Sequence, residues 1–339
     1  MRAGGSRRVD ADPGGWAWAR AFWRALRPAF WVVSIFPLHM GWVLASRQIF
    51  PGLAIWLDFW ARAGAGGATA GEFGAALGAW GVAAGPWLGA MVAIGPLLGG
   101  ATLLHNNAWD LQADRANPRR QQDPLVLGLV SERQARWGAR LLAALGLAVA
   151  AWVGPLFLGF MAACWALAWA YSAPPLRAKG VAGLDVAVNV LGLGVLCTFA
   201  GWSLAAPLRD FPWPFMVLPV LHLASTYVPT TLVDYPTDKA FGYQTIAVRL
   251  GPERAFWVGF AFAVAGNAVF LVAALLDYIV PWKLYVWLWP FTVVELVAYL
   301  GLRRWDDLRR FALSLLVAVA SFGAGVALFL LHYAGWLRL

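Results

Sequence analysis

Residues 85–114 read GPWLGAMVAIGPLLGGATLLHNNAWDLQAD, an apolar run that ends in a group of polar side chains. The apolar part is long enough for a helix that crosses the roughly 30 Å hydrocarbon core of a bilayer, which takes about 20 residues. In the polar part Asp110 and Asp114 stand four residues apart, and on a helix this spacing puts both carboxylates on one face. The stretch therefore predicts a transmembrane helix with an acidic site at one end.

Apolar segments of similar length recur along the whole chain. We expect membrane spans at 29–48, 85–107, 136–153, 156–172, 182–203, 213–233, 255–276, 280–301 and 312–335. The 339 residues are 61% hydrophobic and 13% charged, whereas soluble proteins have about 45–50% and about 25%. This composition excludes a disordered chain, a soluble Rossmann or barrel enzyme and a disulfide-stapled secreted module. We therefore predict an all-α membrane protein, a bundle of nine transmembrane helices.

The positions of the basic residues predict the orientation of the chain. With nine spans and the N-terminus in the cytoplasm, most of the 26 Lys and Arg residues fall on the cytoplasmic side, as the positive-inside rule requires. The net charge of +9 is then a signal of topology and not of nucleic-acid binding. We expect an integral protein of the cell (inner) membrane, with cytoplasmic loops at 108–135, 171–181 and 234–254.

Two segments outside these spans are also informative. Residues 1–28 are expected to form a cytoplasmic arm whose Trp- and Arg-rich part lies as a helix in the membrane interface, and residues 29–339 a single polytopic domain. Residues 49–84 are rich in Gly and Ala. An additional span there would reverse the orientation of every later loop, so we expect a non-cytoplasmic loop with a short amphipathic or re-entrant helix.

A second acidic pair, Asp234 and Asp238, follows the predicted span 213–233 with the same spacing as the first pair. Like charges at this spacing repel, and near a membrane they are partly desolvated. One interpretation is that nearby arginines neutralise ordinary helix-end carboxylates. The other, which the repetition on one membrane face favours, is that carboxylate and amide oxygens hold Mg²⁺. The oxygen ligands available are Asp110, Asp114, Asp234, Asp238, Asn106 and Asn107.

Basic residues accompany both acidic pairs. Arg115 and Arg119 follow the first pair, Lys239 follows the second, and Lys179 lies in a third polar loop on the same face, YSAPPLRAKG at 171–180. Carboxylates, a divalent cation and guanidinium or ammonium groups together make a diphosphate site. The alternative is that these basic residues only express the positive-inside bias.

These motifs resemble those of the UbiA-type intramembrane prenyltransferases. The first motif of that family is NDxxDxxxD, and its second is DxxxD followed by Lys or Arg, Gly and Thr. The matching positions are Asn106, Asn107, Asp110 and Asp114 in the first motif, and Asp234, Asp238, Lys239, Gly242 and Thr245 in the second. The loop at 171–179 and Leu26-Arg27-Pro28 match as well, so the resemblance extends from residue 26 to about residue 335.

Three positions depart from the family pattern. Asn107 stands where Asp is usual, Asp123 where Arg is usual, and Pro236 where many members carry an acidic residue. The first change removes one charge from the metal site, and the second removes one cation that would hold an anion. These changes put the acceptor and the metal dependence in question, whereas all four paired aspartates remain.

The resemblance implies a bundle around a central, laterally open cavity, with the active site at its cytoplasmic side. It implies Mg²⁺-dependent transfer of an isoprenoid chain from a polyprenyl diphosphate to a lipophilic acceptor, aromatic or polyene, within the membrane, with release of diphosphate. The implied metal ligands and catalytic residues are Asp110, Asp114, Asp234 and Asp238, with Asn106 as a further ligand. The implied substrate-binding residues are Asn106, Asn107, Arg115, Arg119, Lys179, Lys239 and Arg27. Tyr171 would shield an allylic cation with its ring.

A few polar residues lie within the predicted spans. Asp185 and Asn189 stand one helical turn apart in span 182–203, and they either face the acceptor pocket or hydrogen-bond a neighbouring helix. The residues interpreted as structural are His39, His222, Glu295 and His332, with His222 the first exception to consider.

Two other classes of protein compete with the enzyme. A transporter would bind a coupling ion with the aspartates, but such sites lie near the bilayer midplane, whereas these acids lie at helix ends. A non-catalytic membrane scaffold would tolerate the loss of both acidic pairs. No pattern in the residues selects the acceptor, the length of the donor chain or an oligomeric state.

Overall fold

The structure is a computed structural model that describes residues 14–337. Within this range the chain is helical apart from loops and one isolated β-bridge between Val181 and Gln244. The helices are α1 (Gly15–Ala25), α2 (Val32–Ser46), α3 (Leu53–Gly64), α4 (Ala70–Val92), α5 (Gly100–Ala116), α6 (Glu132–Val153), α7 (Pro155–Ser172), α8 (Leu184–Asn189), α9 (Cys197–Trp202), α10 (Val217–Ala240), α11 (Ile246–Leu250), α12 (Pro252–Leu275), α13 (Trp282–Leu300) and α14 (Leu308–Tyr333). Two π-helical segments, Ala93–Gly99 and Val190–Leu196, join α4 to α5 and α8 to α9.

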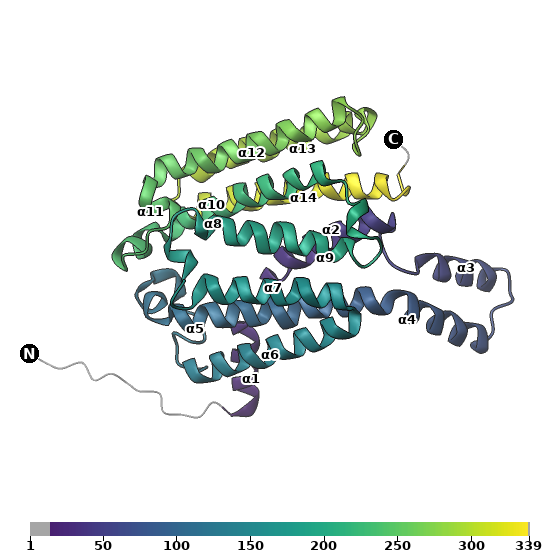
Figure 1. The fold of residues 1–339 in the computed structure, drawn as a ribbon, viewed down its shortest axis with the longest axis horizontal. Coiled ribbons are helices and arrows are strands. Elements are labelled where there is room, and N and C mark those ends of the chain that lie inside the picture. The colour runs from purple at the N-terminus through teal and green to yellow at the C-terminus, as the bar shows by residue number, and fades with distance from the viewer. Residues whose placement is uncertain (1–13, 338–339) are drawn as a thin grey trace, which may run out of the picture.

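The long apolar helices confirm the predicted all-α membrane bundle. Eight of them, among residues 14–337, are long and apolar enough to cross a membrane. The remaining predicted span, 29–48, corresponds to α2, which meets α1 and the turn after it at 46°. The helices pack side by side, as Figure 1 shows. The arm predicted at 1–28 is described only from residue 14 onward, where α1 forms the expected helix.

The prediction for residues 49–84 was wrong in part. α3 is the expected short helix, but α4 begins at Ala70 and continues without a break through the π-helical segment into α5, as one helix of 47 residues. The physical reason is a capping box, in which the Thr69 hydroxyl accepts from the Glu72 N–H at 3.2 Å and the Glu72 carboxylate accepts from the Thr69 N–H at 2.7 Å. This pair starts the helix well before the apolar run.

The long helix still makes a single span. At 1.5 Å per residue it measures about 70 Å, more than twice the thickness of the hydrocarbon core. α3 and the first half of α4 therefore extend beyond the bundle as a helical hairpin, at the right in Figure 1. The predicted orientation of the later loops therefore needs no change.

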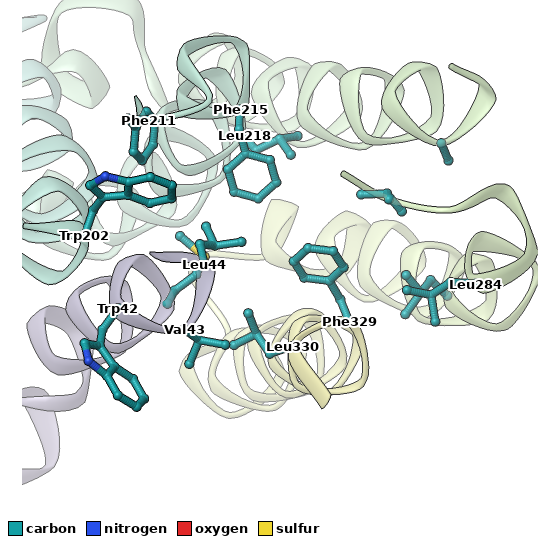
Figure 2. Packing of buried hydrophobic residues seen from close by; sticks show 14 of the residues in the cluster. Trp42, Val43, Leu44, Trp202, Phe211, Phe215, Leu218, Leu284, Phe329 and Leu330 are labelled. Atoms are coloured by element: carbon teal, nitrogen blue, oxygen red, sulfur yellow. The ribbon is translucent and has the colours of Figure 1, made fainter. Parts of the chain in front are cut away.

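The largest apolar cluster connects the two ends of the described chain. Figure 2 shows Leu44 of α2, Trp202 of α9, Leu218 of α10 and Phe329 of α14 gathered around one packed region. Because these helices come from distant parts of the sequence, their shared apolar cluster holds the beginning and the end of the bundle together.

The backbones of α2 and α9 lie so close together that two positions of the contact have no room for a side chain. A Cβ atom on Gly201 would lie 1.8 Å from the carbonyl oxygen of Leu38, and one on Gly41 would lie 2.1 Å from the carbonyl oxygen of Thr198. Small residues at helix contacts are typical of membrane bundles, because they let backbones pack directly.

Candidate active site

The C-terminal end of α5 carries the first acidic pair, and its Asp110 is held by cations. Lys179, from the loop between α7 and α8, contacts Asp110 and also donates to the Asn106 amide oxygen at 3.2 Å. Arg177 approaches the same Asp110 oxygen at 3.6 Å. The side chain of Lys179 is buried, with 7% of the residue exposed. Burial lowers the pKa of its ammonium group, and the Asp110 carboxylate opposes that shift.

Asp114 lies one turn later on α5 and is also largely buried. Its carboxylate pairs with the Arg120 guanidinium at 3.5 Å. Asn107, two turns before Asp114, is fully buried and donates to the Ala25 carbonyl at 3.4 Å. Its amide oxygen has no hydrogen-bond partner among residues 14–337. One buried oxygen near the carboxylates is therefore free to accept a hydrogen bond or to bind a metal ion.

The second acidic pair lies at the C-terminal end of α10, where Asp234 contacts Arg119. Arg119 belongs to the segment that follows α5, so this ion pair connects that segment to α10. Asp238 lies one turn further along α10 and forms no ion pair with a basic side chain in the part of the chain that the structure describes. The two acidic pairs thus lie at one end of the bundle, the left end in Figure 1.

The loop between α7 and α8 completes the site. The Tyr171 hydroxyl, at the end of α7, contacts the Tyr227 hydroxyl of α10. Arg177 donates to the Tyr243 hydroxyl at 2.5 Å, and its guanidinium carbon lies 4.8 Å from the centre of that ring. The backbone N–H of Gln244 donates to the Gly180 carbonyl at 3.0 Å, so the second and third polar loops are joined.

Three residues predicted for the site are exposed or make other contacts. Arg115 is exposed, and Lys239 is exposed and donates to the Tyr235 hydroxyl at 3.3 Å. The Arg27 guanidinium lies over the Phe30 ring, 4.0 Å from its centre. None of these three forms an ion pair with the four aspartates within the described chain.

Asp185 and Asn189 form a structural network. The buried Asp185 carboxylate accepts the N–H groups of Gly183 and Val186, at 2.8 and 3.0 Å, and that of Ile246 at 2.8 Å. Asn189 donates to the Asp185 carbonyl one turn back, at 2.8 Å. For Asp185 this geometry matches the interpretation of a hydrogen bond to a neighbouring helix, since Ile246 begins α11, whereas Asn189 bonds within its own helix.

Sequence reasoning missed three residues of the site. Tyr227 lies two turns before Asp234 on the same face of α10, but many aromatic residues lie in the membrane helices, so this spacing alone does not single it out. Arg177 and Tyr243 meet only through the fold, because they are far apart in sequence and belong to different loops. No local pattern signals such a contact.

The oxygen donors of the site fit a divalent cation that arrives with its anionic partner. Among residues 14–337 no group of three or more His, Cys, Asp and Glu side chains lies close enough to hold a metal ion alone. Mg²⁺, however, commonly takes one or two carboxylates and completes its shell with phosphate oxygens and water. The paired aspartates and the uncompensated Asn107 oxygen provide that donor chemistry.

Comparison with known proteins identifies relatives of this architecture. The model of the UbiA prenyltransferase family matches residues 68–319. The chain is 34% identical over 176 residues to the digeranylgeranylglyceryl phosphate synthase of Ignicoccus hospitalis, covering 50% of this chain and 56% of that protein. It is 32% identical over 192 residues to the bacteriochlorophyll synthase 33 kDa chain of Cereibacter sphaeroides, covering 55% of this chain and 61% of that protein. The matched stretches therefore span little more than half the length of these relatives.

Solved structures agree on the fold. A UbiA homologue from Archaeoglobus fulgidus bound to GPP and Mg²⁺ superposes with a TM-score of 0.63 at 20% identity, covering 91% of this chain and 99% of that one. A UbiA homologue from Aeropyrum pernix K1 gives 0.61 at 23% identity, covering 87% and 96%. With a family model that matches most of its length, the chain belongs to the UbiA prenyltransferase family.

Proposed function

We propose that the protein transfers an isoprenoid chain from a polyprenyl diphosphate to a lipophilic acceptor within the membrane, in a reaction that depends on Mg²⁺ and releases diphosphate. The observation that carries the proposal is the meeting of two acidic helix ends with four cations, Lys179, Arg177, Arg119 and Arg120. Such a mixture of carboxylates and cations binds a diphosphate together with divalent metal, and it has no evident use in a purely apolar bundle.

Asp110, Asp114, Asp234 and Asp238 would hold Mg²⁺, with an amide oxygen of Asn106 or Asn107 in addition. When bound, Mg²⁺ would neutralise the negative charge that develops on the leaving diphosphate. The aspartates would then release Lys179 and Arg119, whose charged groups are long enough to turn toward phosphate oxygens. Arg115, Lys239 and Arg27 remain further candidates for this contact after a change of rotamer.

The remaining steps follow from the side chains around the aspartates. The C–O bond of the donor breaks, its electron pair leaves with diphosphate, and an allylic cation remains. The rings of Tyr171 and Tyr227 would shield that cation from water and stabilise it through their faces. A nucleophilic atom of the acceptor bonds to the cationic carbon, and an aspartate or the released diphosphate takes the acceptor's proton.

The names of the relatives also support a lipophilic acceptor. They include synthases of a glyceryl phosphate lipid and of bacteriochlorophyll, and a homogentisate phytyltransferase from a Synechocystis strain is 30% identical over 171 residues. For this chain we propose an aromatic or polyene acceptor. We also propose that residues 29–339 act as one domain of the cell (inner) membrane whose active-site loops, with residues 1–28, face the cytoplasm.

The test is the loss of one carboxylate from each pair. Asp110→Asn and Asp234→Asn should lower Mg²⁺-dependent binding of geranyl diphosphate at least tenfold, because each removes a metal ligand. Both should also abolish transfer of its labelled chain to lipids extracted from the host membrane. Binding is measured by equilibrium dialysis with labelled geranyl diphosphate, and transfer by chromatography of the lipids.

Asp307→Asn is the matched control. Asp307 also lies at a helix end, where it accepts from the Arg310 N–H at 3.1 Å, and Asn retains that capping role. It should leave binding and transfer unchanged. Binding that both site variants retain would contradict the proposed function, and would favour a scaffold. Uptake of a cation without any transfer would instead favour a transporter.

A further inference from the structure

A pocket on the surface of α6 lies outside the aspartate site. It has a volume of about 400 Å³ and is lined by one face of the first half of that helix, which carries Glu132, Arg133, Arg136, Trp137 and Arg140. None of these residues belongs to the acidic motifs or to the loop between α7 and α8. Three guanidinium groups meet a single carboxylate here, so the pocket has a net positive charge.

Arg136 is held in place by two partners. Its guanidinium group pairs with the Glu132 carboxylate at 2.5 Å, and its guanidinium carbon lies 4.1 Å from the centre of the Trp109 ring. Trp109 belongs to α5 and directly precedes Asp110, so the pocket lies at the same end of the bundle as the acidic pairs. The one carboxylate of the pocket is therefore already used by Arg136.

The other two arginines of the pocket have no acidic partner. Among residues 14–337, Arg133 and Arg140 form no ion pair, and both are exposed. The guanidinium carbon of Arg140 lies 4.9 Å from the centre of the Trp137 ring, a contact that favours one position for its charge. The positive-inside bias accounts for basic residues at this end of a helix. It does not account for aromatic rings that hold two of them at one pocket.

The row of side chains that begins in the pocket shows its level in the membrane. Residues four apart lie above one another on a helix, and in this row Arg133 and Trp137 are followed by Leu141 and Leu145, all of them exposed. The row passes from a charged residue through tryptophan to leucine. Tryptophan is enriched where headgroups meet acyl chains, so the arginines lie at the level of the headgroups.

Two unpaired guanidinium groups next to an exposed apolar row fit an anion that carries acyl chains. We propose that this pocket binds the phosphate group of an anionic membrane lipid, with Arg133 and Arg140 donating to its oxygens and an acyl chain along Leu141 and Leu145. Guanidinium groups are well suited to phosphate, because they present paired N–H donors. A soluble phosphate compound would meet the same arginines but would gain nothing from the apolar row.

The experiment compares lipids that differ in the charge of the headgroup. Phosphatidylglycerol and phosphatidylcholine with identical acyl chains are titrated into the purified protein in detergent, without diphosphate or divalent cation, and bound lipid is counted by native mass spectrometry. Phosphatidylglycerol should bind at least tenfold more tightly, because each arginine near the surface strengthens the binding of an acidic headgroup about fivefold. Equal binding of the two lipids would overturn the proposal.

Variants locate the preference. Arg133→Gln combined with Arg140→Gln should lower the affinity for phosphatidylglycerol at least tenfold, and since both positions are exposed and Gln is a good helix former, the fold is retained. Arg304→Gln combined with Arg309→Gln is the matched control. It removes the same charge from exposed positions around the start of α14, at the same end of the bundle, and should change the affinity less than twofold. Equal effects of the two double substitutions would contradict the proposal.

Glycerol phosphate separates the two sources of the anion, because it carries the phosphate group without acyl chains. At an equal concentration it should leave phosphatidylglycerol bound, since it makes no contact with Leu141 and Leu145. Displacement of the lipid would show that the pocket takes a soluble phosphate compound and would overturn the assignment to a lipid. None of the four aspartates and no transfer step enters these measurements, so their result is independent of the proposed reaction.

Discussion

Lys179 connects parts of the protein that are far apart in the sequence. It extends from the loop between α7 and α8 to two side chains of α5, Asn106 and Asp110. A buried ammonium group of this kind is stabilised by its carboxylate partner, and the carboxylate depends on it in return. The charge of the first acidic pair is therefore balanced before any substrate binds.

Lys179→Met should impair both binding and stability. Loss of the cation leaves Asp110 with only the more distant Arg177, so we expect affinity for geranyl diphosphate with Mg²⁺ to fall at least tenfold. We expect the free energy of unfolding to fall by about 1–3 kcal/mol. Lys283→Met is the control, because Lys283 is exposed in the first turn of α13. It should alter the affinity by no more than twofold and the free energy of unfolding by no more than about 0.5 kcal/mol. Equal effects of the two substitutions would contradict this role.

Among single residues, the sequence predicted those that belong to a recognisable spacing or motif. The aspartates repeat at four-residue intervals, and Lys179 belongs to a polar loop that matches the family motif. Tyr227 carries no such mark, because aromatic residues are common in membrane helices, and its role emerges only from its contact with Tyr171. The exposed positions of Arg115 and Lys239 could not be predicted either, because the positive-inside bias places basic residues there whether or not they bind a ligand.

Among the elements, α2 and α9 make the most demanding contact. Their backbones lie against each other at Gly41 and Gly201, with carbonyl oxygens of the partner helix where a methyl group would be. A backbone carbonyl cannot rotate away as a flexible side chain can, so this contact fixes the distance between the two helices.

Gly201→Ala should therefore destabilise the bundle. Its Cβ atom would overlap the Leu38 carbonyl oxygen, and overpacking of this kind costs about 1–3 kcal/mol. Thermal unfolding in detergent, followed by tryptophan fluorescence, should show a clear decrease in Tm. Gly159→Ala, in α7 with no atom within 4 Å of the added methyl, should leave the Tm unchanged or raise it. A Gly201→Ala variant as stable as the wild type would show that the helices separate freely.

The elements were predictable where hydrophobicity alone decides. The apolar runs of α6, α7, α10 and α12 fall close to the expected spans. The start of α4 was not predictable from hydrophobicity, because Ala and Gly are compatible with both a helix and a loop. The capping pair of Thr69 and Glu72 determines where this helix begins. The π-helical segments are also invisible in a hydropathy pattern, since widening one turn changes no residue type.

For the whole molecule, three of the four aspartates of the site are paired with basic side chains. Asp110, Asp114 and Asp234 each contact a lysine or arginine. The apolar cluster that packs α2 against α14 contains none of the acidic pairs. The folded state should then not require a divalent cation.

Removal of divalent cations should separate stability from binding. We expect EDTA to leave the Tm of the purified protein within about 1 °C, whereas it should abolish binding of geranyl diphosphate. Mg²⁺ and geranyl diphosphate together should raise the Tm. At a ligand concentration of one hundred times Kd, binding adds about 2.7 kcal/mol to the free energy of unfolding. Unfolding caused by EDTA alone would instead indicate a structural metal.

The hairpin of α3 and α4 offers a practical opportunity. α4 runs without interruption into α5, so any body attached to its outer tip shares the orientation of the membrane helices. The turn between Gly64 and Ala70, with Gly66 in a left-handed conformation, faces away from every residue of the aspartate site. A helical adaptor inserted there would give electron microscopy a rigid marker for aligning particles of a small protein that is otherwise surrounded by its micelle. The aspartate site at the opposite end would stay accessible to substrates.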